Sequence, residues 1–359
     1  CNTTGGNNTA IGHQALKANT TGGVNTAVGT DALDSNTTGG NNVAIGYSSL
    51  CTNISGNANT AVGLEALRDN TASNNTAMGQ TAMLLNTSGS SNAAFGFDAL
   101  KFNTTGGDHT AIGKCALSLN TTASSNTAVG SESLSKNTTG AENVAVGKDA
   151  LQKNTTARQN TAVGTSALRD NTTGACNTAM GFNNLVLNTT GICNTAVGRA
   201  SMDANTTGDC NTSIGNNALS SNTTADNNTA VGSFALEQNT TGITNVAVGK
   251  LALNRNTTGQ QNTSMGASSL EANTTGSRNS TAGTSSLATN ISGNDNTAFG
   301  HAALGANTTG SNNTAVGRAS MQANTTAANN TAVGFQALKA NTTGTENTAM
   351  SRDSLSSNT

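Results

Sequence analysis

The chain of 359 residues has no proline and no tryptophan, one tyrosine and seven phenylalanines. Only 34% of its residues are apolar, so it cannot build the thick, aromatic core that a globular domain of this length normally carries. Charged residues are also scarce, and the formal net charge is −2. Disordered chains combine low hydrophobicity with high net charge, which is absent here. The apolar residues recur periodically, which favours a thin ordered core over a random coil.

Groups that could carry catalysis or bind metal are few and dispersed. The three histidines, His13, His109 and His301, stand far apart and are not expected to converge on one metal or one catalytic pair. Acidic residues form no column, which argues against calcium-loaded repeats. No glycine-rich phosphate loop joins a strand to a helix, and the balanced charge gives no footprint for nucleic acid. We therefore expect a protein that is not an enzyme and that uses no cofactor, metal or nucleic acid.

The ends of the sequence carry no recognisable leader or anchor. No basic start precedes an apolar segment, and no apolar run is long enough to span a membrane. The chain begins inside a repeat at Cys1 and stops inside another at Thr359. Solenoids normally need caps on their open edges. We therefore expect either a segment of a longer fibre protein or copies that stack end to end.

What the chain does have is a repeat of 17 residues from end to end. The asparagine that opens each N-T-T-G segment stands at Asn2, Asn19, Asn36 and onward, and one residue is lost just after Asn70. The consensus is N-T-A-V-G, two variable residues, A-L, two variable residues, N-T-T-G and two variable residues. A unit this short cannot hold a helix pair, so each repeat predicts one coil. We predict an all-β, parallel β-solenoid of about 21 coils, a single continuous solenoid over residues 1–359.

The conserved columns predict walls and core. Three repeats replace the Thr of N-T-A-V-G by valine, at Val43, Val144 and Val246. Because alternate strand residues share a face, we expect the Thr/Val and Val/Ile columns to look toward apolar surroundings. The Ala and Gly columns would then present a flat face on which another wall or another subunit packs. We expect the Leu column, such as Leu168 and Leu236, to be buried and the variable pairs to be solvated corners.

Two glycine columns behave differently. The glycine after Val/Ile recurs from Gly12 to Gly334 and gives way to Ser351 in the last repeat. This predicts either a corner with positive φ or a contact too close for a Cβ atom. The glycine of N-T-T-G is replaced by alanine in four repeats, so it is not expected to need positive φ. The four replacements are Ala123, Ala157, Ala225 and Ala327.

The N-T-T segment allows two interpretations. Stacked amides and hydroxyls could form a ladder of hydrogen bonds from coil to coil. Alternatively, each N-x-S/T sequon could carry a glycan on a secreted fibre. The candidate N-glycosylation sites are Asn2, Asn19, Asn36, Asn53, Asn86, Asn103, Asn120, Asn137, Asn154, Asn171, Asn188, Asn205, Asn222, Asn239, Asn256, Asn273, Asn290, Asn307, Asn324 and Asn341. Further sequons arise at Asn7, Asn74, Asn227, Asn279, Asn312 and Asn329.

Three of the six cysteines share a column. Cys176, Cys193 and Cys210 occupy the same place in successive repeats, which places neighbours about 4.8 Å apart as a candidate thiol ladder. That spacing lies within disulfide range for Cα atoms, although parallel side chains would strain the bond. The alternative is that these are tolerated thiols at corners. The other cysteines, in different columns and distant coils, are Cys1, Cys51 and Cys115.

Several segments resemble known fibre repeats. N-V-A-I-G at 42–46 and N-V-A-V-G at 143–147 and 245–249 resemble the strand motif of trimeric autotransporter adhesin heads. That resemblance implies a parallel β-roll wound as a trimer. The longer unit at 329–344 resembles repeat regions of bacterial and phage tail-fibre-type proteins. The resemblance covers the whole chain and implies an architecture rather than an activity.

Three classes of function remain open from the sequence. The first is an extracellular structural shaft, an adhesin stalk or tail-fibre body at a cell or virion surface, built from a homotrimer or an end-to-end fibril and coated with covalent glycans if the sequons are used. The second is a threonine surface, such as Thr20 and Thr37 beside Thr21 and Thr38, that contacts ice, carbohydrate or a host surface. The third is a hydrolytic appendage, which the sequence supports least.

Overall fold

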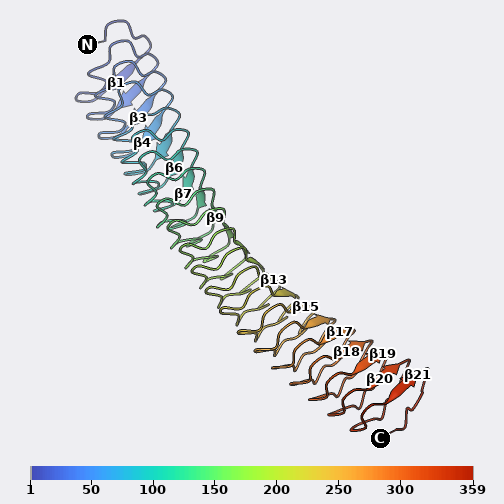
Figure 1. Cartoon of the computed structure of the whole chain (residues 1–359). Coiled ribbons are helices and arrows are strands. Elements are labelled where there is room, and N and C mark those ends of the chain that lie inside the picture. The colour runs from blue at the N-terminus through green and yellow to red at the C-terminus, as the bar shows by residue number, and fades with distance from the viewer. Residues whose placement is uncertain (1, 359) are drawn as a thin grey trace. The chain divides into compact units, whose positions relative to one another are not determined.

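The computed structural model describes residues 2–358, and within that range every regular element is a short β-strand. The chain forms two compact units, Cys1–Asn177 and Thr178–Thr359. In each unit the backbone winds in successive coils, and the strands stack along one side of them (Figure 1). The predicted parallel β-solenoid is confirmed as the fold of both units. That one solenoid runs unbroken through residues 1–359 remains a prediction.

Each coil contributes one strand of three residues. In the first unit the strands are β1 (Thr9–Ile11), β2 (Thr26–Val28), β3 (Val43–Ile45), β4 (Thr60–Val62), β5 (Thr76–Met78), β6 (Ala93–Phe95), β7 (Thr110–Ile112), β8 (Thr127–Val129), β9 (Val144–Val146) and β10 (Thr161–Val163). In the second unit they are β11 (Thr178–Met180), β12 (Thr195–Val197), β13 (Thr212–Ile214), β14 (Thr229–Val231), β15 (Val246–Val248), β16 (Thr263–Met265), β17 (Ser280–Ala282), β18 (Thr297–Phe299), β19 (Thr314–Val316), β20 (Thr331–Val333) and β21 (Thr348–Met350).

Consecutive strands within a unit are parallel and in register. Ala10 pairs with Ala27 in the first unit, and Ala298 pairs with Ala315 in the second. The stacking continues beyond the strands, because backbone groups elsewhere in the coil bond to the next coil as well. For example, the N–H of Leu33 donates to the carbonyl of Ser49 at 3.1 Å. Identical positions of neighbouring coils therefore lie above one another around most of the turn.

The interior of each coil is narrow. Between the first and the last coil, the middle residue of each strand, the residue before leucine and the leucine itself are buried, as Ala27, Ala32 and Leu33 show. The predicted burial of the Leu column is thus confirmed. Polar side chains complete the interior, since the two asparagine columns described below are also buried. This core is thin, as the low apolar content of the sequence predicted.

The expected orientation of the strands was wrong. The Ala column points inward, while the Thr/Val and Val/Ile columns are half-buried or exposed on the outside, with Val144 at 37% and Ile45 at 40% exposure. The physical reason is space: leucine and two asparagines already fill the coil, so the strand can place only a small side chain opposite them. The valine substitutions are tolerated because β-branched residues suit a strand that is half-exposed.

The glycine that follows each strand has the conformation that the sequence predicted. Its φ lies at +133° in Gly29 and close to that value in its copies, and Ser351 adopts +135° in the last coil. The corner is also crowded, because a Cβ atom on Gly29 would stand 2.6 Å from the carbonyl oxygen of Gly46. Both reasons offered for this glycine therefore apply. The glycine of N-T-T-G has no positive φ, as expected.

Candidate functional site: ladders between coils

The asparagines of N-T-T form a buried ladder. In Asn256 the side-chain Nδ2 donates to Oδ1 of Asn239 at 2.8 Å and to the carbonyl of Gly259 at 2.9 Å. Oδ1 of Asn256 in turn accepts from Nδ2 of Asn273 at 2.8 Å. Each amide thus closes its own corner and binds both neighbouring coils. The ladder interpretation of the N-T-T segment is confirmed, and we call this column the N-T-T ladder.

The ladder decides which sequons are accessible in the folded coil. Asn2 is exposed. All the remaining candidate glycosylation sites, from Asn19 to Asn341, are fully buried. A sugar on their amide nitrogen would break the bonds that Nδ2 donates. Asn279 is buried as well. The sequons whose asparagine is exposed, at a corner with φ near 60°, are Asn7, Asn74, Asn227, Asn312 and Asn329.

The missing residue after Asn70 interrupts the N-T-T ladder. Nδ2 of Asn70 donates to the carbonyl of Ala72, only two residues on, at 2.9 Å. Oδ1 of Asn53 is consequently buried without a hydrogen-bond partner among the described residues. On the other side Asn86 still donates to Oδ1 of Asn70 at 2.6 Å. The single deletion therefore leaves one orphaned acceptor while the strands keep their register, with Ala61 opposite Ala77.

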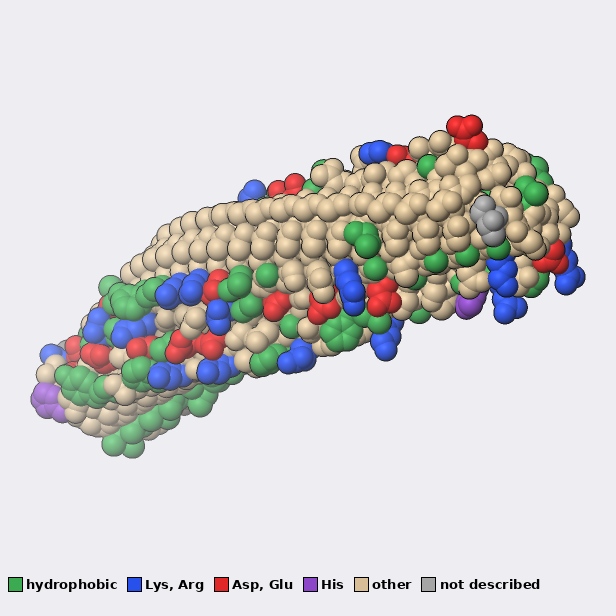
Figure 2. Space-filling view, turned by 90° about the horizontal axis from the view of Figure 1, so that it is seen from below, with side chains coloured by type: hydrophobic (Ala, Val, Ile, Leu, Met, Phe, Trp, Pro, Cys, Tyr) green, Lys and Arg blue, Asp and Glu red, His purple; other side chains and the backbone are tan. Residues whose placement is uncertain are grey.

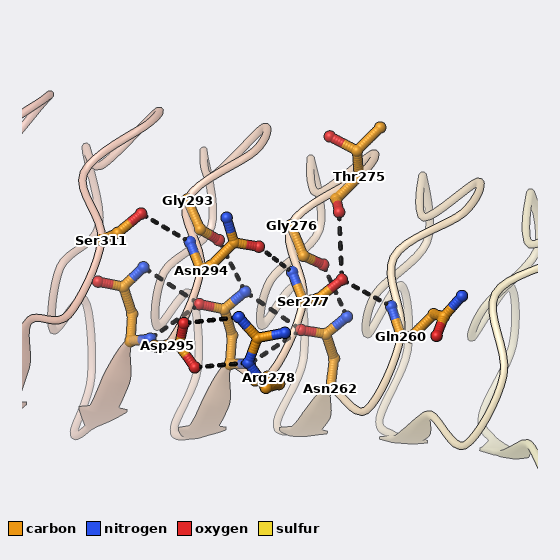
Figure 3. Close-up of polar contacts among 12 residues, drawn as sticks. Gln260, Asn262, Thr275, Gly276, Ser277, Arg278, Gly293, Asn294, Asp295 and Ser311 are labelled. Carbon is orange, nitrogen blue, oxygen red and sulfur yellow. Dashed lines mark hydrogen bonds and ion pairs between the residues drawn. The ribbon is translucent and has the colours of Figure 1, made fainter.

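A second buried ladder was missed at the sequence level. It consists of the asparagines that open N-T-A-V-G. The backbone N–H of Asn262 donates to Oδ1 of Asn245 at 3.0 Å. Its Nδ2 donates to the carbonyl of Gly276 at 2.9 Å (Figure 3). The signal was present in the sequence as an asparagine before nearly every strand. We call this column the strand ladder.

His109 replaces asparagine in the strand ladder. Its ring is 1% exposed, and Nε2 lies 2.7 Å from the carbonyl of Ala123. Nδ1 accepts from the backbone N–H of Asn126 at 3.2 Å. The ring nitrogens thus take the places of Nδ2 and Oδ1. Burial lowers the pKa of His109, and the hydrogen bond to the carbonyl of Ala123 and the charge of Asp108 only partly offset this.

An outer ladder follows one exposed corner. Oγ of Ser277 accepts from the backbone N–H of Gln260 at 3.1 Å, and the N–H of Ser277 donates to Oδ1 of Asn294 at 2.8 Å (Figure 3). Beside it the guanidinium of Arg278 forms a bidentate ion pair with Asp295, with the closest nitrogen and oxygen 2.7 Å apart. Exposed pairs of this kind stabilise little, so this corner mainly satisfies backbone groups.

The two threonines of N-T-T differ in their hydrogen bonding. The hydroxyl of the first threonine donates to the next coil, as from Oγ1 of Thr257 to the carbonyl of Thr274 at 3.0 Å. The second threonine, such as Thr258, is exposed. In the view of Figure 2, charged side chains gather in bands, and the band beside them consists of uncharged polar side chains and backbone. The hydroxyls of the second threonine column are therefore available to solvent.

The cysteine column is exposed, but it is divided between the two units. Cys176 belongs to the first unit, and its thiol lies 3.6 Å from Oε1 of Gln159. Cys193 and Cys210 occupy the same corner of consecutive coils in the second unit, with φ of 57° and 56°. Whether these thiols form a ladder remains a hypothesis. Cys1 lies outside the described residues, and Cys51 and Cys115 are half-buried.

Among residues 2–358 no group of three or more His, Cys, Asp or Glu side chains could hold a metal ion, and no cavity is present. That part of the chain also has no helix with the length and apolarity needed to cross a bilayer. No protein-family model matches the sequence, and no curated protein matches it either.

Proposed function

We propose that the protein is a non-enzymatic shaft, a spacer that forms part of an extracellular fibre at a cell or virion surface. The observation that carries this proposal is the repetition of the same bonds between coils. Asn256 and its copies bind the coil before and the coil after, and the strand ladder does the same. Each coil can therefore be added or removed without changing the type of contact that remains. Length is the property that such a chain encodes most directly.

The test is an internal deletion that respects the repeat. Removal of residues 240–324 takes out five coils and joins Asn239 to Thr325, which restores N-T-T. The native appendage that contains the chain should then be shorter by roughly 24 Å per copy along its axis, at about 4.8 Å for each coil. Electron microscopy of the appendage measures this. An appendage of unchanged length, or one that is absent from the surface by antibody labelling, contradicts the proposal.

We further propose that the shaft associates with itself, either as a trimer of the kind that the sequence resemblance implies or end to end. The outer face of the strands supports side-by-side association such as the trimer, because in each unit it carries a row of large, half-exposed apolar side chains, including Ile112 at 40% in the first and Met180 at 45% in the second. Such rows normally mark contact surfaces. Light scattering on the purified chain should give about three times 35.5 kDa for a trimer and a rising mass with concentration for end-to-end growth. A mass of one chain at all concentrations refutes both forms.

A second candidate function is a contact surface for ice or carbohydrate. It is favoured by the exposed second threonine column, in which Thr241, Thr258 and Thr275 follow one another at the spacing of the coils. Regular hydroxyls and methyls could order water or line a sugar chain. Thermal hysteresis tests ice, and retention on immobilised glycans tests carbohydrate. Replacement of several of these threonines by lysine should abolish either activity while the coils remain folded, because their side chains lie outside the core.

A further inference from the structure

We propose that His109 makes one coil of the first unit sensitive to acid, so that protonation of its ring opens the chain locally between residues 103 and 126. This inference is independent of the proposed shaft function. It follows from a substitution in the strand ladder, where His109 stands in a column otherwise built from asparagine. An asparagine amide cannot take up a proton at moderate pH, but an imidazole can. The ladder therefore contains one titratable rung.

The folded coil fits the neutral ring. One nitrogen must donate to the carbonyl of Ala123, 2.7 Å away, and the other must accept from the N–H of Asn126, 3.2 Å away. Only the neutral tautomer with the proton on Nε2 satisfies both contacts. The backbone N–H of His109 is also engaged, because it donates to Oδ1 of Asn92 at 2.9 Å. His109 thus binds the coil on each side.

Protonation would disrupt this arrangement at Nδ1. The added proton would point at the N–H of Asn126, so that two donors would face each other across 3.2 Å. The ring has no space in which to turn. Nε2 lies 2.7 Å from the carbonyl of Ala123 and 3.1 Å from Nδ2 of Asn120, and the side chain is 1% exposed. The charged ring can reach water only if the coil opens.

The surrounding charges do little to help the charged form. Asp108, exposed beside the ring, favours protonation, but burial outweighs it and the pKa of His109 is lowered. The ring meets Asn120 and Asn126, and the backbone N–H of His109 meets Asn92; all three are uncharged. The opened coil binds a proton more readily than the closed coil. The stability of the closed coil is therefore complete above the ordinary histidine pKa of 6.5 and is lost as the pH falls below that value.

Hydrogen exchange on the full chain tests the inference. His109→Asn restores the column and supplies the reference, and wild type and variant are compared at the same pH so that intrinsic exchange rates cancel. At pH 7.5 the amides of residues 103–126 should exchange similarly in both chains. At pH 5.5 they should exchange up to about tenfold faster in the wild type, since one pH unit below the ordinary pKa changes the opening equilibrium by roughly that factor. Equal exchange at pH 5.5 overturns the proposal.

Two further variants separate the ladder position from histidine itself. His301 is exposed at a corner, so His301→Asn should leave the acid response unchanged. Asn211→His places the ring in a matched site, because Nδ2 of Asn211 donates to the carbonyl of Ala225 at 2.8 Å as His109 does to that of Ala123. This variant should create a second acid-sensitive coil in the second unit. An acid response that spreads evenly along the chain, or that disappears in His301→Asn, contradicts the inference.

Discussion

Substitution of one rung of the N-T-T ladder by alanine should destabilise the chain strongly but locally. In Asn256→Ala, Oδ1 of Asn239 loses the hydrogen bond that it accepts at 2.8 Å and becomes a buried orphan, which costs about 1–3 kcal/mol. The carbonyl of Gly259 loses one hydrogen bond but still accepts from Nδ2 of Asn245. Nδ2 of Asn273 also loses one hydrogen bond but still donates to the carbonyl of Gly276. These two losses add about 0.5–1.5 kcal/mol each. The free energy of opening should therefore fall by about 2–6 kcal/mol.

The chain supplies its own control for this substitution. Oδ1 of Asn53 already lacks a partner among the described residues, so Asn53→Ala breaks the bonds to Asn36 and Gly56 but none from the following coil. Its cost should be smaller than that of Asn256→Ala by about 0.5–1.5 kcal/mol, because only Asn256→Ala also removes the bond that Nδ2 of the following asparagine donates. Hydrogen exchange resolved by peptide measures both. An Asn53→Ala loss as large as that of Asn256→Ala, or faster exchange throughout the second unit, would refute the reasoning.

Three other predictions test the core, the glycine corner and the sequons. Leu236→Ala empties a fully buried site and should lower the free energy of local opening by about 2–5 kcal/mol in exchange measurements, with distant coils unaffected. Ser351→Gly relieves the strain of a φ of +135°, so the free energy of local opening in the last coil should rise by about 1–3 kcal/mol and hydrogen exchange there should slow. Unchanged exchange would show that the corner tolerates a side chain. Peptide mass spectrometry of the natural protein should find either no N-linked sugar or sugar confined to exposed sequons such as Asn227 and Asn329, and sugar on Asn256 would contradict the buried ladder.

Repetition explains why much of the fold was predictable. A short repeat forces one coil to stack on an identical one, so the parallel register of Ala10 on Ala27 follows from the period alone. The same logic predicted the buried leucines and offered the N-T-T ladder as one of two interpretations, because an amide that recurs in every coil lies within reach of its own copies. The positive φ at Gly29 followed from a glycine that almost never varies. These are properties of columns, and columns are visible in one sequence.

Which side chains of the strand point into the coil could not be predicted from the repeat alone. The substitution of valine for threonine at Val43 shows that the position tolerates both residues, and a half-exposed strand surface does so as readily as a core. What decides the orientation is the volume left inside the coil by Leu33 and by the two asparagine ladders. That volume depends on the path of the whole turn. The strand ladder was missed for the same reason, since its asparagines are buried only because the strand turns its alanine inward.

The path of the turn depends on residues with positive φ, some of which are types that rarely adopt this conformation. Besides the glycine, each coil holds three residues with φ near +50 to +60°, such as Asp31, Leu33 and Asn41. Asp and Asn tolerate this conformation, but leucine does so at a cost of about 1–2 kcal/mol. In Leu33 the cost is offset by full burial and by the N–H bond to the carbonyl of Ser49. A coil held alone would lose both compensations. The left-handed leucine is thus a product of the stack, and it explains why the repeat is stable only in the company of its neighbours.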